Sequence, residues 1–90
     1  MTRVRYIFVW DRDTESVVAS AFVPLGPIPS EEIPKDTTHG LVRREDEDSF
    51  LAQLSRQFPG DRYLWGGGTG PTLVRAVEGF FALEHDTDHF

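Results

Sequence analysis

The stretch from Tyr63 to Thr72, with the sequence YLWGGGTGPT, constrains the fold more than any other part of the chain. It is typical of the end of a strand, a glycine turn and the start of a helix. Glycine adopts positive φ angles and leaves backbone N–H groups uncovered, and the first amides of a helix have no intrahelical partner. Together such groups can hold a phosphate or a carboxylate. The same residues can also form a tight connection without a ligand, and both interpretations stay open.

A β-hairpin is predicted near the start of the chain. Residues 3–10 alternate, so that Tyr6, Phe8 and Trp10 share one face, and β-branched residues dominate 17–23. The polar residues 11–16 between these segments favour a turn. Residues 41–44 and 62–65 are candidates for two further short strands.

Two later segments show helical periodicity. Phe50, Leu54 and Phe58 step by four and are followed by Pro59-Gly60, which predicts a helix over 47–58. Residues 72–84 carry a broad apolar face, and the proline before them suits a first helical position, so we expect a second helix there. A hairpin turning at 78–79 is the alternative, because a glycine inside a helix costs about 1 kcal/mol.

The order of these segments predicts an α+β fold of the type ββ(β)αβα. We expect a small two-layer domain, with the β-hairpin and one or two further short strands packed against two amphipathic helices on one face of the sheet. Residues 1–90 would form a single domain, in which 24–40 is a Pro-rich loop and 85–90 a polar tail.

Charge and composition restrict the partners that the chain can have. The net charge is −6, and residues 46–90 carry eight acidic groups against three basic ones. Nucleic-acid binding needs a basic face, so it is unlikely here, whereas a basic protein surface would suit an acidic domain. The absence of cysteine excludes disulfides and thiolate sites. The apolar run 6–10 is too short for a signal peptide, and no apolar stretch reaches membrane-spanning length, so we expect a cytoplasmic protein without a membrane segment.

The Pro-rich loop and the acidic run after it form the leading candidate surface. The loop can act as a lid or binding loop, or as a rigid crossover packed by its apolar residues. The acidic run 45–48 follows two arginines and can either stabilise the start of a helix or present an acidic face to a partner. The leading hypothesis is a small acidic, non-enzymatic binding protein of the inhibitor or adaptor type. Its candidate partner-binding residues are Glu45, Glu47, Asp48, Ile28 and Ile33.

The glycine run carries the alternative hypothesis. Gly66 to Gly70 resembles the GGGTG signature with which tubulin and its bacterial cell-division relatives hold nucleotide phosphates. The resemblance covers five of ninety residues, and Pro71 and Thr72 depart from the family pattern, so no membership follows. The geometry alone suggests a small protein that binds or sequesters a phosphorylated or nucleotide ligand. Its candidate residues are Gly67, Gly68, Thr69 and Gly70 as donors, Trp65 as a stacking platform and Arg62 as a charge clamp.

Signals for catalysis or metal binding are weak. Asp36 to His39 brings hydroxyls near one histidine, but no nucleophile elbow accompanies them. His85 and His89 would share a helix face, yet no third ligand stands at a recognisable spacing. We therefore expect no enzyme activity, no cofactor and no metal, and the sequence leaves the oligomeric state open.

Overall fold

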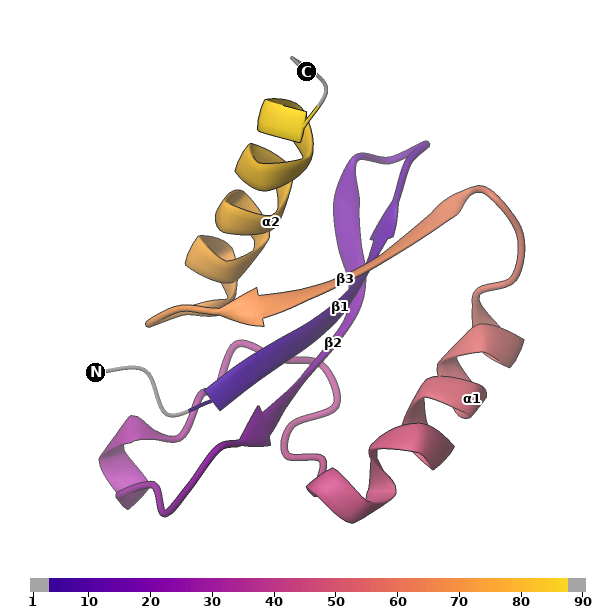
Figure 1. Ribbon diagram of the computed structural model, residues 1–90. Helices are drawn as coiled ribbons and strands as arrows, with labels where there is room; N and C mark the ends of the chain where they lie inside the picture. Colours follow the sequence, from indigo (N-terminus) through magenta and orange to yellow (C-terminus); the bar gives the residue numbers. More distant parts are fainter. Residues whose placement is uncertain (1–3, 88–90) are drawn as a thin grey trace.

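Three strands form one antiparallel sheet with the first strand in the middle. In this computed structural model, which describes the backbone of residues 4–87 and the side chains of residues 4–82, the sheet order is β2-β1-β3 (Figure 1). β1 spans Val4–Asp11, β2 spans Ser16–Pro24 and β3 spans Tyr63–Thr69. The register shifts between Val9 and Trp10, where a bulge interrupts the pairing of β1 with β2. Because β1 has a neighbour on each edge, it is the strand around which the core forms.

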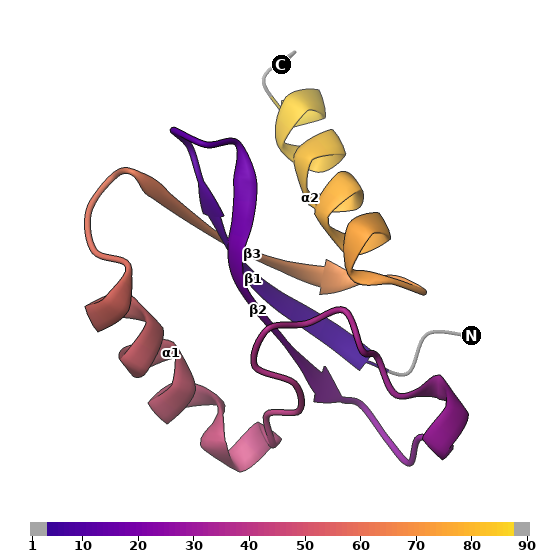
Figure 2. The same cartoon turned by 180° about the vertical axis from the view of Figure 1, so that it is seen from behind.

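The two helices cover opposite faces of this sheet (Figures 1 and 2). Tyr6 and Phe8 of β1 belong to the core under α2 (Leu73–Thr87), whereas Ile7 and Val9 belong to the clusters under α1 (Glu47–Gln57). The α+β class and the order of elements are thus confirmed. The expectation that both helices lie on one face is wrong, because β1 is apolar on both of its faces and each face needs its own cover.

Both predicted helices form. In α1, Leu54 is fully buried against Val9 and Ala19, as expected for the middle residue of the apolar series at 50, 54 and 58. The second helix runs through Gly79 without a break, so the alternative hairpin at 78–79 is wrong. Of the predicted polar tail, residues 85–87 belong to α2, and residues 88–90 lie outside the described part of the chain.

The glycine run is a strand and not a turn. Gly66, Gly67 and Gly68 lie within β3 and pair with Phe8, Ile7 and Tyr6 of β1. A Cβ atom at Gly66 would lie 2.5 Å from the tip of the Phe8 ring, whose centroid is 5.3 Å from that of Phe80 in an edge-to-face contact. Glycine therefore serves close packing here: it leaves room for an aromatic ring between β3 and α2.

Residues 25–43 wrap around the outer edge of β2. Ile28 packs on the α2 side of the sheet, and Val42 is buried on the α1 side. Between them the segment bonds to β2: the N–H of His39 donates to the Ser20 carbonyl, and Leu41 bridges to Phe22. This bridge stands in place of the expected strand at 41–44. Two short 3₁₀ helices, η1 (Ser30–Glu32) and η2 (Arg44–Asp46), complete the connection.

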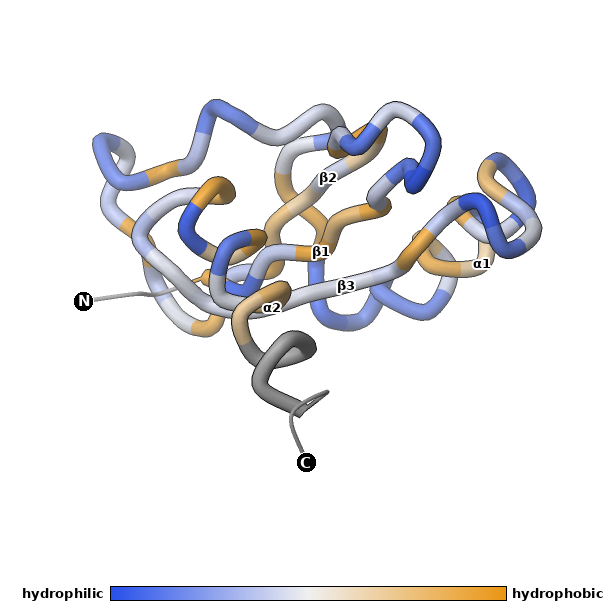
Figure 3. Tube along the Cα trace, turned by 90° about the horizontal axis from the view of Figure 1, so that it is seen from above, coloured by the Kyte–Doolittle hydropathy of each residue, from blue (hydrophilic) through white to orange (hydrophobic). Residues whose placement is uncertain are grey.

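The hydropathy of the chain follows this layout (Figure 3). Apolar stretches of β1 and β2 lie in the middle of the molecule, and the most hydrophilic stretches fall on the connections around them. β3 is intermediate along most of its length, as expected of a glycine-rich strand. The sheet therefore supplies the core, and the connections and helix ends supply the polar surface on which a site can form.

Candidate functional site

The start of α2 already holds an anion, which is the side chain of Asp36. Its Oδ2 accepts the N–H of Leu73, the first residue of α2, at 3.2 Å. Thr72 caps the same turn, since its Oγ1 accepts the N–H of Arg75 at 3.2 Å. A carboxylate at this place satisfies an unpaired amide and interacts favourably with the helix dipole. The Pro-rich loop thus supplies the negative charge that the alternative hypothesis assigned to a ligand.

Arg62 faces a carboxylate of its own chain. Its Nε and Nη2 donate to the two carboxylate oxygens of Asp11 at 3.0 and 2.9 Å, and Asp13 lies 3.5 Å away. Asp11 also accepts the N–H groups of Asp13 and Thr14, which fixes the hairpin turn. The hydrogen bonds from Arg62 are the largest influence that lowers the pKa of Asp11, which falls from 3.8 to about 2. Arg62 therefore joins the start of β3 to the end of β1.

The candidate residues for a phosphorylated ligand do not converge. Arg62 precedes β3 and Gly70 follows it, so eight extended residue steps separate their Cα atoms by roughly 26 Å. Trp65 is half-buried on the α1 side, next to Leu54, whereas Thr69 is exposed and Gly70 lies against Ala76 of α2. Anion binding at Gly67, Gly68, Thr69 and Gly70 stays a prediction, but the described geometry does not assemble the stacking platform and the clamp beside it.

Of the four acidic residues at 45–48, one is half-buried and paired with the sheet, and three are exposed. Glu47 is half-buried, and its Oε1 accepts from Nη2 of Arg5 on β1 at 2.5 Å. Glu45, Asp46 and Asp48 are exposed, and none makes an ion pair within 4 Å among the residues that the structure describes. All four acids stand in the first turn of η2 or α1, as dipole stabilisation predicts. One acid thus fastens the helix to the sheet, and three remain available to a partner.

An open groove borders these exposed acids. It has a volume of about 370 Å³ and lies between residues 41–43 and the first half of α1; we call it the α1 groove. Leu41, Val42 and Phe50 form its apolar lining, and Leu41 is 51% exposed. Asp46 and Arg43 are the charged residues of its lining, and the exposed Glu45 and Asp48 stand outside the lining, next to Asp46 in the chain. Asp46, Glu45 and Asp48 make no ion pair with a described residue, so this edge of the groove is suited to a side chain or segment that is apolar in part and cationic in part.

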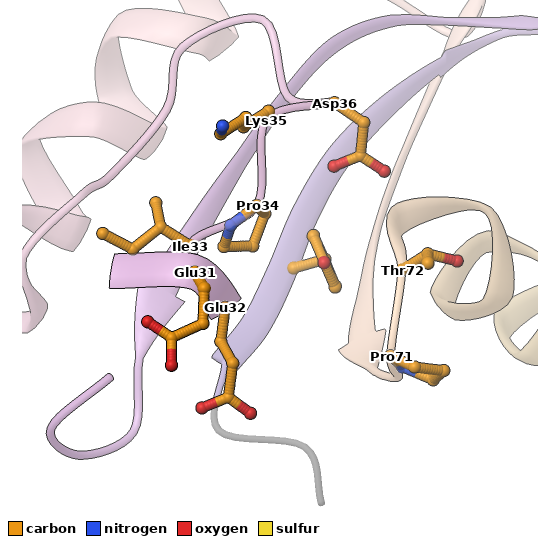
Figure 4. A pocket seen from close by; sticks show the side chains of 9 residues that line it. Glu31, Glu32, Ile33, Pro34, Lys35, Asp36, Pro71 and Thr72 are labelled. Carbon is orange, nitrogen blue, oxygen red and sulfur yellow. The ribbon is translucent and has the colours of Figure 1, made fainter. Parts of the chain in front are cut away.

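A second groove lies between η1 and the start of α2. Its volume is about 500 Å³, and we call it the Tyr6 groove after the strand residue in its lining (Figure 4). Of the two candidate loop residues, Ile33 lines this groove and is 40% exposed, whereas Ile28 packs into the core. The rigid-crossover interpretation therefore fits Ile28, and the binding-loop interpretation fits Ile33.

The hydroxyl of Thr38 holds the loop to the sheet, whereas the buried hydroxyl of Thr37 has no hydrogen-bond partner in the described part of the chain. The backbone N–H of Ser20 donates to Oγ1 of Thr38 at 2.8 Å, and the N–H of Thr38 donates to Oγ of Ser20 at 3.0 Å. The Thr38 hydroxyl also lies 3.1 Å from the Ser20 carbonyl and 2.8 Å from Nδ1 of His39. The three bonds between Thr38 and Ser20 close a connection across the edge of β2, which favours a structural role for Thr38.

Neither a metal site nor a membrane span is found in the described part of the chain. Within it, no three His, Cys, Asp or Glu side chains are placed to share a metal ion. The side chain of His85 is not described, and His89 lies outside the described residues, so the His85–His89 pair is not tested. No described helix is both long and apolar enough to cross a bilayer.

Comparison with known proteins yields no match to a family model, to a curated protein or to a solved structure. The case for a function therefore depends on the geometry and charge of this chain alone.

Proposed function

We propose that this chain is a non-enzymatic domain that binds a basic surface of a partner protein. The carrying observation is the α1 groove, in which exposed Leu41 and half-buried Phe50 share the lining with Asp46, one of three exposed acids at 45–48 that make no ion pair with a described residue. A partner that offers an apolar side chain with neighbouring Arg or Lys would bury the exposed leucine and neutralise the acids. Binding to such a surface would act by occlusion or as an adaptor contact, in the cytoplasm.

The three exposed acids suit recognition better than they suit stability. Glu45 and Asp48 lie in water, where ion pairing within the chain would contribute little. A cationic partner would relieve the repulsion between these acids. Its attraction to them would raise both the association rate and the selectivity for basic surfaces. Because the net charge of the chain is also negative, long-range steering acts in the same direction.

A peptide-display selection on the full chain tests this proposal and needs no identified partner. We expect enriched peptides to combine Arg or Lys with Leu, Phe or Met, and their affinity to fall with rising salt because the contacts are exposed. The charge reversal Glu45→Lys should weaken binding of a selected peptide about three- to tenfold. Asp61→Lys is the matched control, because Asp61 is also exposed and lies at the other end of α1, in the turn before β3.

The selection can also contradict the proposal. Enrichment of acidic or uncharged peptides would show that charge complementarity does not govern recognition. Equal losses for Glu45→Lys and Asp61→Lys would show that only the net charge matters and that the α1 groove is not the contact.

A further inference from the structure

Tyr6 is a buried residue whose hydroxyl group has no hydrogen-bond partner among the described residues. Tyr6 is 1% exposed and lines the groove, and its hydroxyl makes no hydrogen bond to any residue that the structure describes. In the described part of the chain, the one enclosed side-chain polar atom without a partner is Oγ1 of Thr37, so the Tyr6 hydroxyl is not enclosed: it reaches the open groove and is accessible to a polar group from outside. Burial, and then the charge of Asp36, raise the pKa of Tyr6, so its hydroxyl stays protonated at neutral pH.

Carboxylates dominate the charge around this hydroxyl. Glu31, Glu32 and Asp36 all line the groove, and none forms an ion pair within 4 Å with a described residue. Asp36 uses Oδ2 for the N–H of Leu73, which leaves its Oδ1 with no partner in the described part of the chain. Lys35 is the single cation in the lining, and Figure 4 shows its ammonium nitrogen directed away from the Asp36 carboxylate. The groove therefore has an excess of two negative charges that no described residue balances.

The remaining lining is apolar and close to these acids. Ile33 and Pro34 stand on the η1 side and Pro71 on the α2 side, with the Asp36 carboxylate directed into the space between them (Figure 4). Long cationic side chains pack their methylene stems on such surfaces and place the charged end among acceptors. An anionic ligand would be repelled by the three carboxylates of the lining, and a neutral one would leave their negative charge unbalanced.

We infer that the Tyr6 groove binds the side chain of an arginine or lysine carried by an extended basic segment of the partner protein. The stem would lie against Ile33, Pro34 and Pro71, and the charged head would donate to Asp36 and to the oxygen of Tyr6. Charge-assisted hydrogen bonds of this kind are the strong ones, and guanidinium can donate to both acceptors at once. This inference rests on the proposed function, since it adds a second contact point for the same basic partner.

The wall of the groove is held in place before any ligand binds. Asp36 is bonded to the start of α2, and two residues later Thr38 is bonded to β2. Pro34 restricts the backbone between η1 and these anchors. A site whose walls are already fixed loses little conformational entropy on binding, which favours a small, specific contact.

The test is a titration of the ¹⁵N-labelled full chain with two matched pentapeptides, followed by NMR. One is acetyl-Gly-Gly-Arg-Gly-Gly amide, and the other carries citrulline, the neutral analogue of arginine. We expect the arginine peptide alone to shift the amide resonances of Tyr6, Asp36 and Leu73, with a dissociation constant on the order of millimolar. The Leu73 amide is a direct reporter, because it donates to Asp36.

Two variants locate the contact. Tyr6→Phe removes only the hydroxyl, and Asp36→Asn removes the charge but keeps an oxygen that can accept the Leu73 N–H. Each should weaken the arginine peptide about three- to tenfold without changing the dispersion of the spectrum. The control Asp61→Asn removes an exposed carboxylate from the turn before β3, outside both grooves, and should leave the dissociation constant unchanged.

Three outcomes would overturn the inference. Equal binding of the citrulline peptide would show that charge does not decide recognition. Shifts confined to residues of the α1 groove, with loss of binding in Glu45→Gln, would leave the proposed function standing and remove the Tyr6 groove from it. Tighter binding of spermine than of the arginine peptide at the same resonances would identify a free polyamine as the ligand, in place of a protein segment.

Discussion

Replacing Gly66 by alanine would place a methyl group where the ring of Phe8 lies. The added Cβ would be 2.5 Å from Cζ of Phe8 and 3.0 and 3.1 Å from its two Cε atoms. Carbon atoms in contact normally stay about 3.5–4.0 Å apart, so either the ring or β3 has to move. Phe8 is 0% exposed and lies edge-to-face on Phe80, which leaves its ring no open space to enter.

The size of the effect follows from two opposing contributions. Overpacking a closed core costs about 1–3 kcal/mol, whereas replacing a glycine in an allowed conformation stabilises by about 0.4–1 kcal/mol through the unfolded chain. We therefore expect Gly66→Ala to lower the free energy of unfolding by about 1–2 kcal/mol. For a domain of this size, this corresponds to a fall in Tm of about 4–16 °C. Urea unfolding followed by circular dichroism measures it, with an unchanged m-value if the native state stays compact.

Gly79→Ala is the matched control. Gly79 is in the interior of α2, and a Cβ there would meet nothing within 4 Å, so this variant should be about 1 kcal/mol more stable than the natural chain. In the Gly66→Ala background, Phe8→Leu should cost less than it does alone, because the smaller side chain relieves the clash. If Gly66→Ala is as stable as the natural chain while Gly79→Ala gains stability, the close approach of Phe8 to β3 is contradicted.

Three further predictions concern the ion pair, the core and the helix start. The pKa of Asp11, lowered to about 2, means that its stabilising effect is complete above its ordinary value of 3.8 and is lost as the pH falls toward 2. Arg62→Gln should therefore flatten the decline of Tm over this acid range, and an unchanged slope would contradict the role of the pair. Leu54→Ala should lower the free energy of unfolding by about 2–5 kcal/mol in urea, since Leu54 is fully buried, and a loss below about 1 kcal/mol would show that α1 is not packed as described. Inorganic phosphate should leave Tm unchanged, because Asp36 already bonds to the start of α2; a Tm increase that Gly68→Val abolishes would restore the anion hypothesis.

The periodic parts of the chain could be predicted because their signals are local. The hairpin, α1 and α2 each depend on the spacing of apolar residues along a few turns or a few strand positions. The sequence also contained the signal that the helices cover opposite faces of the sheet, although we expected both on one face. Ile7 and Val9 are as apolar as Tyr6 and Phe8, and a strand that is apolar on both faces is typical of the centre of a covered sheet.

The glycine run could not be assigned from local signals. Glycine has a low strand propensity, so Gly66 to Gly68 indicated a turn. What makes them a strand is the Phe8 ring, which is far away in the sequence and has room only where β3 lacks side chains. The same holds for Arg62, whose partner Asp11 is 51 residues away. A contact between residues so far apart in the sequence gives Arg62 a structural role instead of a ligand-binding one. The spacing of residues along the chain cannot reveal such a contact.

The Asp36 contact changes how the long loop should be understood. A Pro-rich loop of this length suggested either a lid or binding loop or a rigid crossover, and the bond between the Asp36 carboxylate and the Leu73 N–H favours a fixed loop that can still bind a partner. The carboxylate uses one oxygen to fix α2, and its other oxygen has no partner among the described residues at the groove that Tyr6 lines. The loop can therefore contribute to recognition without closing over a ligand. Substitution of Asp36 by glycine should then impair both α2 stability and basic-peptide binding, whereas Tyr6→Phe should impair binding alone.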